Sequence, residues 1–217
     1  MQFASFTLIF LFLPITMLLF YLTPNRWKRE VMLGISLLFL CSGGWLAAAV
    51  EILLTALTYG AGLLLEHLRQ RKHFSRLVLT GSILLHFGAL LLLRSDWLFS
   101  LKAGWFSGKS LFPLGLAFFT LQSVGYCIDV FRGKIHGEKN WRQLGLYLLF
   151  YPRLIMGPVV SYSVAVKSLC TPVFDIARVG QGLLRFLIGL GKKLILANWL
   201  GVNSFLAHGY YKYQYLM

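Results

Sequence analysis

The sequence predicts an all-α integral membrane protein that crosses the bilayer several times through helices, some of them broken or re-entrant. The composition supports this class, because 58% of the 217 residues are hydrophobic and 13% are charged, whereas about a quarter of a typical soluble chain is charged. The mean hydropathy is +0.70. The apolar residues occur in runs near the roughly 20 residues that a helix needs to cross a bilayer, and prolines and glycines interrupt two of these runs.

Six apolar segments of one membrane domain, residues 1–217, are predicted to enter the bilayer. The run 31–65 carries a single charge, Glu51, and as one helix it would be about 52 Å long, too long for a single pass. We therefore expect two passes there, with a turn near residues 42–44. The first run has no basic residue before it, which favours a retained helix over a cleaved signal peptide. The other predicted segments are 3–22, 77–93, 111–128 and 182–200.

The net charge of +14 comes mainly from basic clusters between the apolar runs, where membrane proteins carry their orientation signals. Two predicted passes separate each cluster from the next, so all three are expected on the cytoplasmic side, with the N-terminus outside. The basic residues do not gather on one soluble face, which disfavours nucleic acid as a partner and leaves the lipid bilayer. The clusters are Arg26, Lys28 and Arg29; Arg69, Arg71, Lys72 and Arg76; and Arg132, Lys134, Lys139 and Arg142.

The motifs of soluble enzymes are missing or incomplete. Gly108-Lys109-Ser110 lacks the glycine five residues earlier that a phosphate loop requires. The three cysteines have no CxxC spacing, which favours reduced thiols over a disulfide framework. The histidines have neither helical pair spacing nor a nearby cysteine or second acid, so no metal site is predicted.

Several ionisable residues fall inside the apolar runs or at their ends, where they are costly and often functional. His86 lies in the middle of a run, either in a functional role or as a neutral imidazole bonded to a neighbouring helix. Asp129 and Arg132 are three residues apart, so they either pair on one helix face or anchor the helix end at the membrane surface. Lys192 and Lys193 interrupt the last run; they mark a helix end, reach a polar cavity or snorkel to the interface.

The segment LYLLFYPRLIMGPVV, residues 146–160, is apolar but cannot be one regular helix. Pro152 and Pro158 each remove a backbone donor, and Gly157 permits a turn or a close approach. Irregular backbone at membrane depth is tolerated only where protein or a water-filled cavity covers it. We therefore expect a broken or re-entrant element beside a polar cavity, with Arg153 facing that cavity.

The run 111–133 has the same pattern. Pro113 and Gly115 break its start, and Thr120 and Gln122 place polar groups in its middle, where they need partners. Two broken elements with polar groups predict a pathway through the membrane. On these grounds alone, the pathway belongs either to a transporter or to a catalytic tunnel.

These two segments resemble the bacterial membrane-bound O-acyltransferases (MBOATs), most closely the branch that includes the alginate O-acetyltransferase membrane subunit. The first motif reads Pro-x-Gly-x-x-Phe-x-Thr-x-Gln and then Tyr-x-x-Asp-x-aromatic-Arg-Gly. The second reads Phe-aromatic-Pro-x-Leu-Ile-x-Gly-Pro, and the segment 182–198 resembles the next segment of the family pattern. The matching residues are Pro113, Gly115, Phe118, Thr120, Gln122, Tyr126, Asp129, Phe131, Arg132 and Gly133, then Phe150, Tyr151, Pro152, Leu154, Ile155, Gly157 and Pro158, and later Lys192, Lys193 and Asn198.

The resemblance implies a partial MBOAT fold in the bacterial inner membrane and an O-acyltransferase activity. In the family, a histidine acts as general base inside a tunnel that crosses the membrane. That histidine belongs to a Trp-His-Gly element in the second half of family members, and residues 1–217 contain no such element. The chain is therefore expected to correspond to the N-terminal half of an acyltransferase and to be inactive alone.

The resemblance also implies the substrates and partners. The acyl group is expected to be acetyl, carried by a donor such as the thioester acetyl-CoA, with no bound cofactor. The final acceptor is expected to be an exported polysaccharide such as alginate, with periplasmic or membrane partner proteins. The chain supplies tunnel wall and no catalytic residue. Expected polar support comes from Gln122, Asp129, Arg132, Lys192 and Lys193, and the re-entrant motif comprises Pro113, Gly115, Pro152, Gly157 and Pro158.

Two alternatives stay open at the level of sequence. The same broken helices suit a non-catalytic membrane subunit or a transporter component that uses them as a permeation path. An inactive truncated product is the other interpretation. A downstream half with the Trp-His-Gly histidine would favour the enzyme, and a stable product of 217 residues would favour the subunit.

Overall fold

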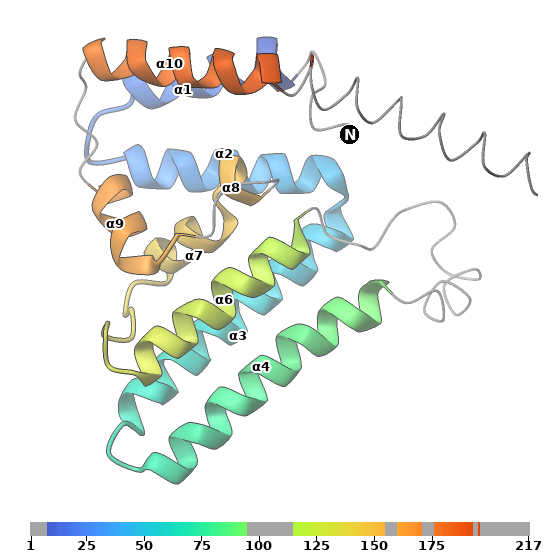
Figure 1. The fold of residues 1–217 in the computed structure, drawn as a ribbon, viewed down its shortest axis with the longest axis vertical. Helices are drawn as coiled ribbons and strands as arrows, with labels where there is room; N and C mark the ends of the chain where they lie inside the picture. The colour runs from blue at the N-terminus through green and yellow to red at the C-terminus, as the bar shows by residue number, and fades with distance from the viewer. Residues whose placement is uncertain (1–7, 95–114, 155–159, 171–175, 193–194, 196–217) are drawn as a thin grey trace, which may run out of the picture. The chain divides into compact units, whose positions relative to one another are not determined.

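The computed structural model describes residues 8–94, 115–154, 160–170, 176–192 and 195. The chain divides into two compact units, Met1–Thr171 and Pro172–Met217. All regular structure in the described residues is helical (Figure 1), which confirms the all-α class. The first unit contains the π-helix η1 (Leu8–Phe12) and the helices α1 (Leu13–Leu22), α2 (Lys28–Gly43), α3 (Trp45–His67), α4 (Lys72–Arg94), α6 (Leu116–Phe131), α7 (Trp141–Leu149), α8 (Tyr151–Leu154) and α9 (Tyr162–Cys170); the second contains α10 (Ile176–Gly191).

Two of the described helices, α3 and α4, are long and apolar enough to cross a membrane. Each has 23 residues, which gives about 35 Å of helix against a hydrocarbon core of roughly 30 Å. Helices α1, α6 and α10 are apolar but shorter. The expectation of six membrane-entering segments stays a prediction.

Helix α4 has an apolar exposed face and a polar buried face. Its exposed side carries Leu77, Leu84 and Leu91, which are spaced by seven residues and are 68%, 67% and 69% exposed. Its buried side carries Ser82 and His86, which are 8% and 1% exposed. In a soluble protein the apolar side of a helix faces the core. The reverse pattern is typical of a helix whose surroundings are lipid.

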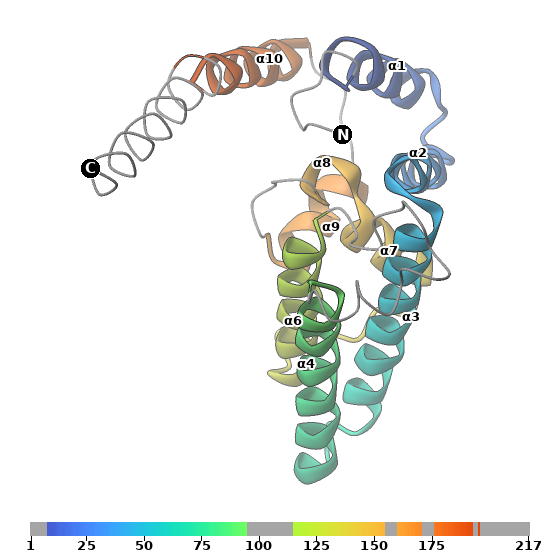
Figure 2. The ribbon, with the colours of Figure 1, turned by 90° about the vertical axis from the view of Figure 1, so that its right-hand side faces the viewer.

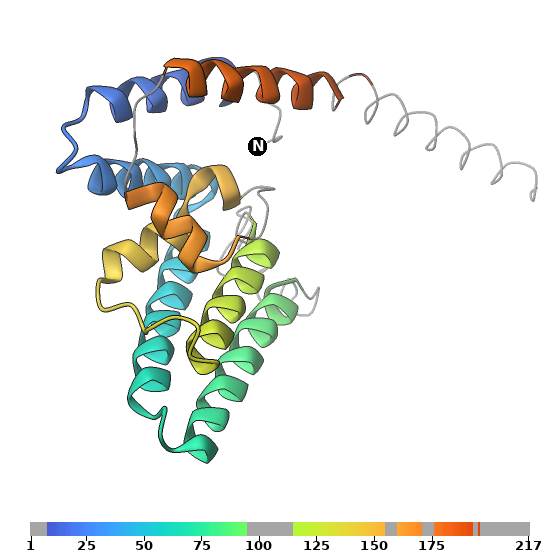
Figure 3. The same cartoon turned by 60° about the vertical axis from the view of Figure 1, so that its left-hand side comes forward.

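Helices α3, α4 and α6 pack against one another side by side, and α2 lies across the end of this group (Figures 1, 2 and 3). The break between α2 and α3 falls at Gly44, within the predicted turn at 42–44. Helix α2 packs on α7 as well as on α3, and it does not run alongside α3 (Figure 3). The predicted turn is confirmed, and the two passes stay a prediction.

Two contacts link the third basic cluster with the regions of the other two. Arg69 donates from Nη2 to the carbonyl of Gly133 at 3.5 Å, which brings the second and third clusters to one end of the α3, α4 and α6 group. Arg142 of the third cluster lies 3.8 Å from Glu30, the residue directly after the first cluster. The second and third clusters thus lie at one end of this group, whereas the first cluster lies at the start of α2. That all three share the cytoplasmic side stays a prediction.

The packed interior of the first unit lies where α3, α6 and α7 meet. Its most buried apolar side chains include Leu65 of α3, Phe119 of α6 and Leu144 of α7. Helices α3 and α6 approach closely at Gly62, where an added Cβ would lie 2.7 Å from Cε1 of Tyr126. A glycine at this position therefore lets the aromatic ring lie against the backbone of α3.

Replacement of Gly62 by alanine is expected to destabilise the α3–α6 contact. The new methyl group would lie 2.7 Å from the ring and 2.8 Å from the hydroxyl oxygen of Tyr126, and overpacking of this kind costs about 1–3 kcal/mol. The midpoint of thermal unfolding in detergent should fall by several degrees. Gly60→Ala is the matched control, because nothing lies within 4 Å of its added Cβ and alanine favours helix. Equal effects of the two substitutions would contradict the close approach.

Candidate functional site

The two broken elements predicted from the sequence meet in the structure. Gly115 caps the start of α6 with φ +80°, and a Cβ on it would lie 1.7 Å from the carbonyl oxygen of Leu154, the last residue of α8. A side chain at residue 115 would therefore be excluded both by its backbone angle and by the backbone of the other element. The breaks form one junction, although their motifs are about forty residues apart. Pro113, Gly157 and Pro158 lie outside the described residues.

Tyr151 fastens the α8 side of this junction to the N-terminal helices. Its hydroxyl lies 2.7 Å from the hydroxyl of Thr16 on α1, and its backbone N–H donates to Oγ of Ser36 on α2 at 3.3 Å. Its ring packs edge-on against Phe12, with centroids 5.1 Å apart. The backbone donor that the helix break frees is thus satisfied by a side chain, as an apolar environment requires. Pro152, next in the chain, is exposed.

Arg153 is half-buried beside the junction. Its guanidinium lies 5.4 Å from the ring centroid of Phe150 and 5.9 Å from that of Tyr147. Its Nη1 atom is buried and has no hydrogen-bond partner among the residues that the structure describes. Aromatic faces stabilise a cation but leave its donors unused. Arg153 therefore offers a free donor at the place where the expected polar cavity was assigned.

A polar layer crosses the interior of the α3, α4 and α6 group. Nδ1 of His86 lies 2.8 Å from the carbonyl oxygen of Ser82, so Nδ1 carries a proton, because a carbonyl only accepts. Nε2 lies 2.9 Å from the hydroxyl of Thr58 on α3. In a neutral ring Nε2 accepts, and the Thr58 hydroxyl donates to it in preference to the carbonyl of Leu54, 2.8 Å away. His86 thus links two helices, which is the structural role that the sequence left open.

Glu51, two turns before Thr58 on α3, is a further buried polar residue. It is 0% exposed, and neither carboxylate oxygen has a hydrogen-bond partner within the described part of the chain. The hydroxyls of Thr120 and Ser123 on α6 are also buried without such partners. Buried polar groups normally have partners, so these three side chains can bond to water or to a polar substrate. The sequence carried a signal for Glu51, because it is the one charge in the run 31–65.

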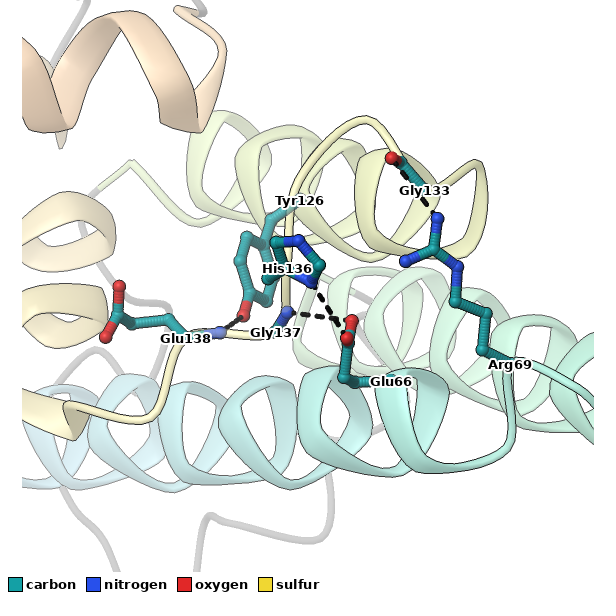
Figure 4. Close-up of polar contacts among 7 residues, drawn as sticks. All are labelled: Glu66, Arg69, Tyr126, Gly133, His136, Gly137 and Glu138. Carbon is teal, nitrogen blue, oxygen red and sulfur yellow. Dashed lines mark hydrogen bonds and ion pairs between the residues drawn. The ribbon is translucent and has the colours of Figure 1, made fainter.

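A clamp formed by Glu66, Tyr126 and Tyr162 holds the loop between α6 and α7. Figure 4 shows the contacts that Glu66 and Tyr126 make with this loop. The Glu66 carboxylate accepts from Nδ1 of His136 at 2.9 Å and from the backbone N–H of Gly137 at 3.2 Å. The hydroxyl of Tyr126 accepts from the backbone N–H of residue 138 at 2.8 Å. Three helices thus contribute to the position of one short loop.

Glu138 joins this loop to α9. Tyr162 donates to one of its carboxylate oxygens, and the backbone N–H of Asn140 donates to the other at 2.8 Å. Burial, together with the hydrogen bond to Glu138, raises the pKa of Tyr162, so its hydroxyl keeps its proton and remains a donor. Asn140 then caps α7 by accepting from the N–H of Arg142 at 3.1 Å. Sequence reasoning missed this clamp, because its partners are up to about seventy residues apart.

The residues expected to give polar support do not converge on one point. Gln122 is buried in the middle of α6, whereas Asp129 and Arg132 lie at its end. Asp129 is 3.8 Å from Nζ of Lys134, and the i, i+3 pairing with Arg132 is not formed. The reason is that α6 ends at Phe131 and the chain folds back, with the N–H of residue 134 donating to the Asp129 carbonyl at 3.0 Å.

The two lysines of the last run belong to the second unit. Lys192 is exposed and lies in a π-helical turn that continues α10, so no helix end is observed at this lysine. Lys193 lies outside the described residues. Among the residues that the structure does describe, no group of three histidine, cysteine or acidic side chains has the arrangement of a metal site.

Thr58→Val is expected to destabilise the bundle more than Thr55→Val. The first substitution leaves Nε2 of His86 without its partner, and a buried unsatisfied group costs about 1–3 kcal/mol. The second removes a hydroxyl that bonds only to the carbonyl of Glu51, on its own helix. Both positions are buried, so the pair is matched, and the difference in unfolding midpoint measures the contact between helices. Equal midpoints would contradict it.

Glu66→Ala is expected to release the loop that the clamp holds. Trypsin cleavage of the purified protein at Arg132, Lys134 and Lys139 should become several-fold faster, because cleavage follows the population of the opened loop. His67→Ala is the neighbouring control, since His67 is exposed and its side chain takes no part in the clamp. Unchanged cleavage in Glu66→Ala would show that the loop is held by other contacts.

Comparisons with known proteins confirm the resemblance found in the motifs. The chain is 28% identical over 206 residues to the probable alginate O-acetylase AlgI of Pseudomonas fluorescens, a match that covers 93% of this chain and 40% of that protein. The corresponding protein of Pseudomonas putida is 29% identical over 216 residues, covering 93% of this chain and 44% of that protein. A peptidoglycan O-acetyltransferase of Helicobacter pylori is 26% identical over 113 residues, which is 40% of this chain and 21% of that protein.

No family model and no solved structure matches the chain. The chain spans about two fifths of the length of the alginate O-acetylases that it matches. The similarity runs through both broken elements and the junction between them, since it covers nearly all of the chain. The chain is thus similar to bacterial O-acetylases over 93% of its own length.

Proposed function

We propose that the chain is the N-terminal portion of a membrane O-acyltransferase that transfers an acetyl group toward an exported polysaccharide. The observation that carries this proposal is the junction of Gly115 and Leu154, because it joins the two segments that bear the acyltransferase motifs. The similarity to two differently named groups of O-acetyltransferases supports the reaction type. A polysaccharide such as alginate is the proposed acceptor, through a periplasmic or membrane partner protein.

In the proposed reaction the junction shapes the path of the substrates, and other groups carry out the chemistry. In acetyl transfer from a thioester such as acetyl-CoA, the acceptor hydroxyl loses its proton to a base, a C–O bond forms and the C–S bond breaks. The proposed base is a histidine outside residues 1–217, so the chain alone is expected to be inactive. The described residues would shape the path to that base, with the rigid junction as wall and the free donor of Arg153 beside it.

The proposed setting is the bacterial inner membrane, with several passes and the N-terminus outside. The basic end of the α3, α4 and α6 group would face the cytoplasm, where such residues accumulate. Asp129 and Arg132 lie at that end and Gln122 lies deeper along α6. The three would therefore act at different depths of one path, from its cytoplasmic mouth inward.

A transporter component or non-catalytic membrane subunit is the second candidate. Glu51 supports it, because a fully buried carboxylate without a partner among the described residues is typical of proton and ion pathways in membranes. In that role the broken elements would form a permeation path and no acyl transfer would occur. Loss of polysaccharide export together with unchanged acetylation would favour this candidate.

Gly115→Ala, introduced in the chromosome of the source bacterium, is expected to abolish O-acetylation of its exported polysaccharide. The added Cβ would lie 1.7 Å from the Leu154 carbonyl oxygen, so the junction must open. Proton NMR of the purified polysaccharide measures the acetyl content. Gly125→Ala is the matched control on the same helix, because nothing lies within 4 Å of its added Cβ, and acetylation should persist.

Membrane levels of both variants are compared by immunoblot with an antibody to the loop 129–142. If Gly115→Ala accumulates normally and acetylation persists, the junction has no part in acyl transfer. If deletion of the whole gene leaves acetylation intact, the acyltransferase proposal itself fails. A band of about 24.6 kDa or of roughly twice that mass shows whether the native product is longer than residues 1–217.

A further inference from the structure

A cavity of about 220 Å³ lies between α1, α2 and the α7–α8 segment. Most of its wall is apolar and includes Phe20, Met32 and Phe150. Lys28 and Arg29, the first two residues of α2, also line it. The cavity therefore combines an apolar interior with two positive charges.

Lys28 has the environment of a cation that lacks a counter-ion. It is 9% exposed, and its Nζ lies 5.1 Å from the ring centroid of Phe20. Among the described residues no carboxylate forms an ion pair with it; the nearby acid, Glu30, lies 3.8 Å from Arg142. A buried charge needs a partner, and the aromatic ring supplies only part of the stabilisation. An anion is the complement that this position requires.

The neighbouring residues indicate where that anion comes from. Lys28 comes soon after helix α1, whose outward side chains Leu18 and Leu22 are 61% and 72% exposed. Basic residues directly after an apolar helix attract the anionic lipids of a membrane surface. A larger cavity of about 440 Å³ between α2, α3 and α7 has no charged residue in its lining, so it offers nothing to an anionic group.

We propose that the cavity of Lys28 binds an anionic glycerophospholipid, with the lipid phosphate at Lys28 and Arg29. The first part of one acyl chain would lie along Met32 and Phe150. Sites that enclose a whole small ligand measure roughly 300–1,000 Å³, so a cavity of about 220 Å³ holds one end of the lipid while the rest stays in the bilayer. Because Pro152 also lines the cavity, the bound lipid would pack against the re-entrant segment.

The test compares two photoactivatable lipids on the whole protein in nanodiscs of phosphatidylcholine. One probe is phosphatidylglycerol and the other is phosphatidylcholine, each with the reactive group near the headgroup, and labelled peptides are mapped by mass spectrometry. The phosphatidylglycerol probe should label peptides from α1, α2 and α8 several-fold more than the phosphatidylcholine probe. Equal labelling by the two probes would overturn the proposal, because the charge would then play no part.

Lys28→Met removes the charge and keeps a side chain of similar length. Labelling by the phosphatidylglycerol probe should fall roughly fivefold, which corresponds to about 1 kcal/mol for one basic residue near an anionic surface. Lys72→Met is the control of equal charge change, since Lys72 is exposed at the start of α4, and labelling should hold. Lys28→Arg should retain it.

Three results would contradict the site. They are unchanged labelling in Lys28→Met, an equal loss in Lys72→Met, and a cavity that no lipid probe labels because another segment of the protein fills it. If Lys28→Met fails to accumulate, the comparison of the two probes on the wild-type protein still shows whether the cavity prefers an anionic lipid. Labelling by the lipid probes does not depend on acetylation. The experiment therefore tests the lipid site separately from the proposed acyltransferase function.

Discussion

An apolar surrounding gives polar groups no solvent, and this constraint organises the first unit. The exposed face of α4 is leucine-rich, whereas the side chains of Ser75, Ser82 and His86 are buried. His86 bonds to Thr58 of α3, and Ser82 lies 3.5 Å from the Cys127 sulfur of α6. Helices α3, α4 and α6 are thus connected through polar contacts as well as through apolar packing. Such contacts fix which faces of the helices meet, because an alternative packing would leave the same groups without partners.

The broken elements obey the same constraint by a different means. A helix break frees backbone donors and acceptors, and at membrane depth these must be covered by protein. Tyr151 shows how this is done, since its N–H is taken by Ser36 and its hydroxyl by Thr16. Gly115 completes the arrangement from α6, because without a side chain it can lie directly against the carbonyl of Leu154. The irregular backbone at residues 115 and 151–154 is therefore part of the packing.

The sequence predicted features that depend on local composition and failed where contacts are distant. The all-α class, the long helices α3 and α4, the turn near Gly44 and the two broken segments could be predicted from run lengths and from proline and glycine positions. The packing of α2 on α7 could not, because it joins segments about a hundred residues apart. The partner of Asp129 was missed because the end of α6 at Phe131 decides it.

The candidate site likewise combines features that the sequence predicts with contacts that it does not predict. The sequence identified Gly115 and Pro152 as helix breakers, but no local sequence pattern predicts that their segments touch. The clamp residues Glu66 and Tyr126 have ordinary sequence surroundings and gain a role only through a loop far along the chain. Glu51 is the exception, because a lone carboxylate in a run of 35 residues is visible in the sequence.

The distribution of satisfied and unsatisfied polar groups separates scaffold from candidate site. In the clamp, both carboxylate oxygens of Glu66 and of Glu138 accept hydrogen bonds from the loop or from α9. Such a fully bonded network costs energy to rearrange and has little capacity left for a ligand. Glu51 and Arg153 are the opposite case, with buried carboxyl oxygens and a buried Nη1 that have no hydrogen-bond partner in the described ranges, and Lys28 has no carboxylate partner there.

Folding alone gives no reason to keep such groups, because replacement of a buried charge by an apolar residue is often neutral or stabilising. Their presence is explained if each meets a polar partner that is not part of the described helices. Arg153 lies beside the junction and stacks on Phe150, and Phe150 also lines the cavity of Lys28. The segment that carries the second motif is therefore bordered by a guanidinium and an ammonium that have no carboxylate partner among the described residues, so a polar ligand at either group would lie next to the broken backbone.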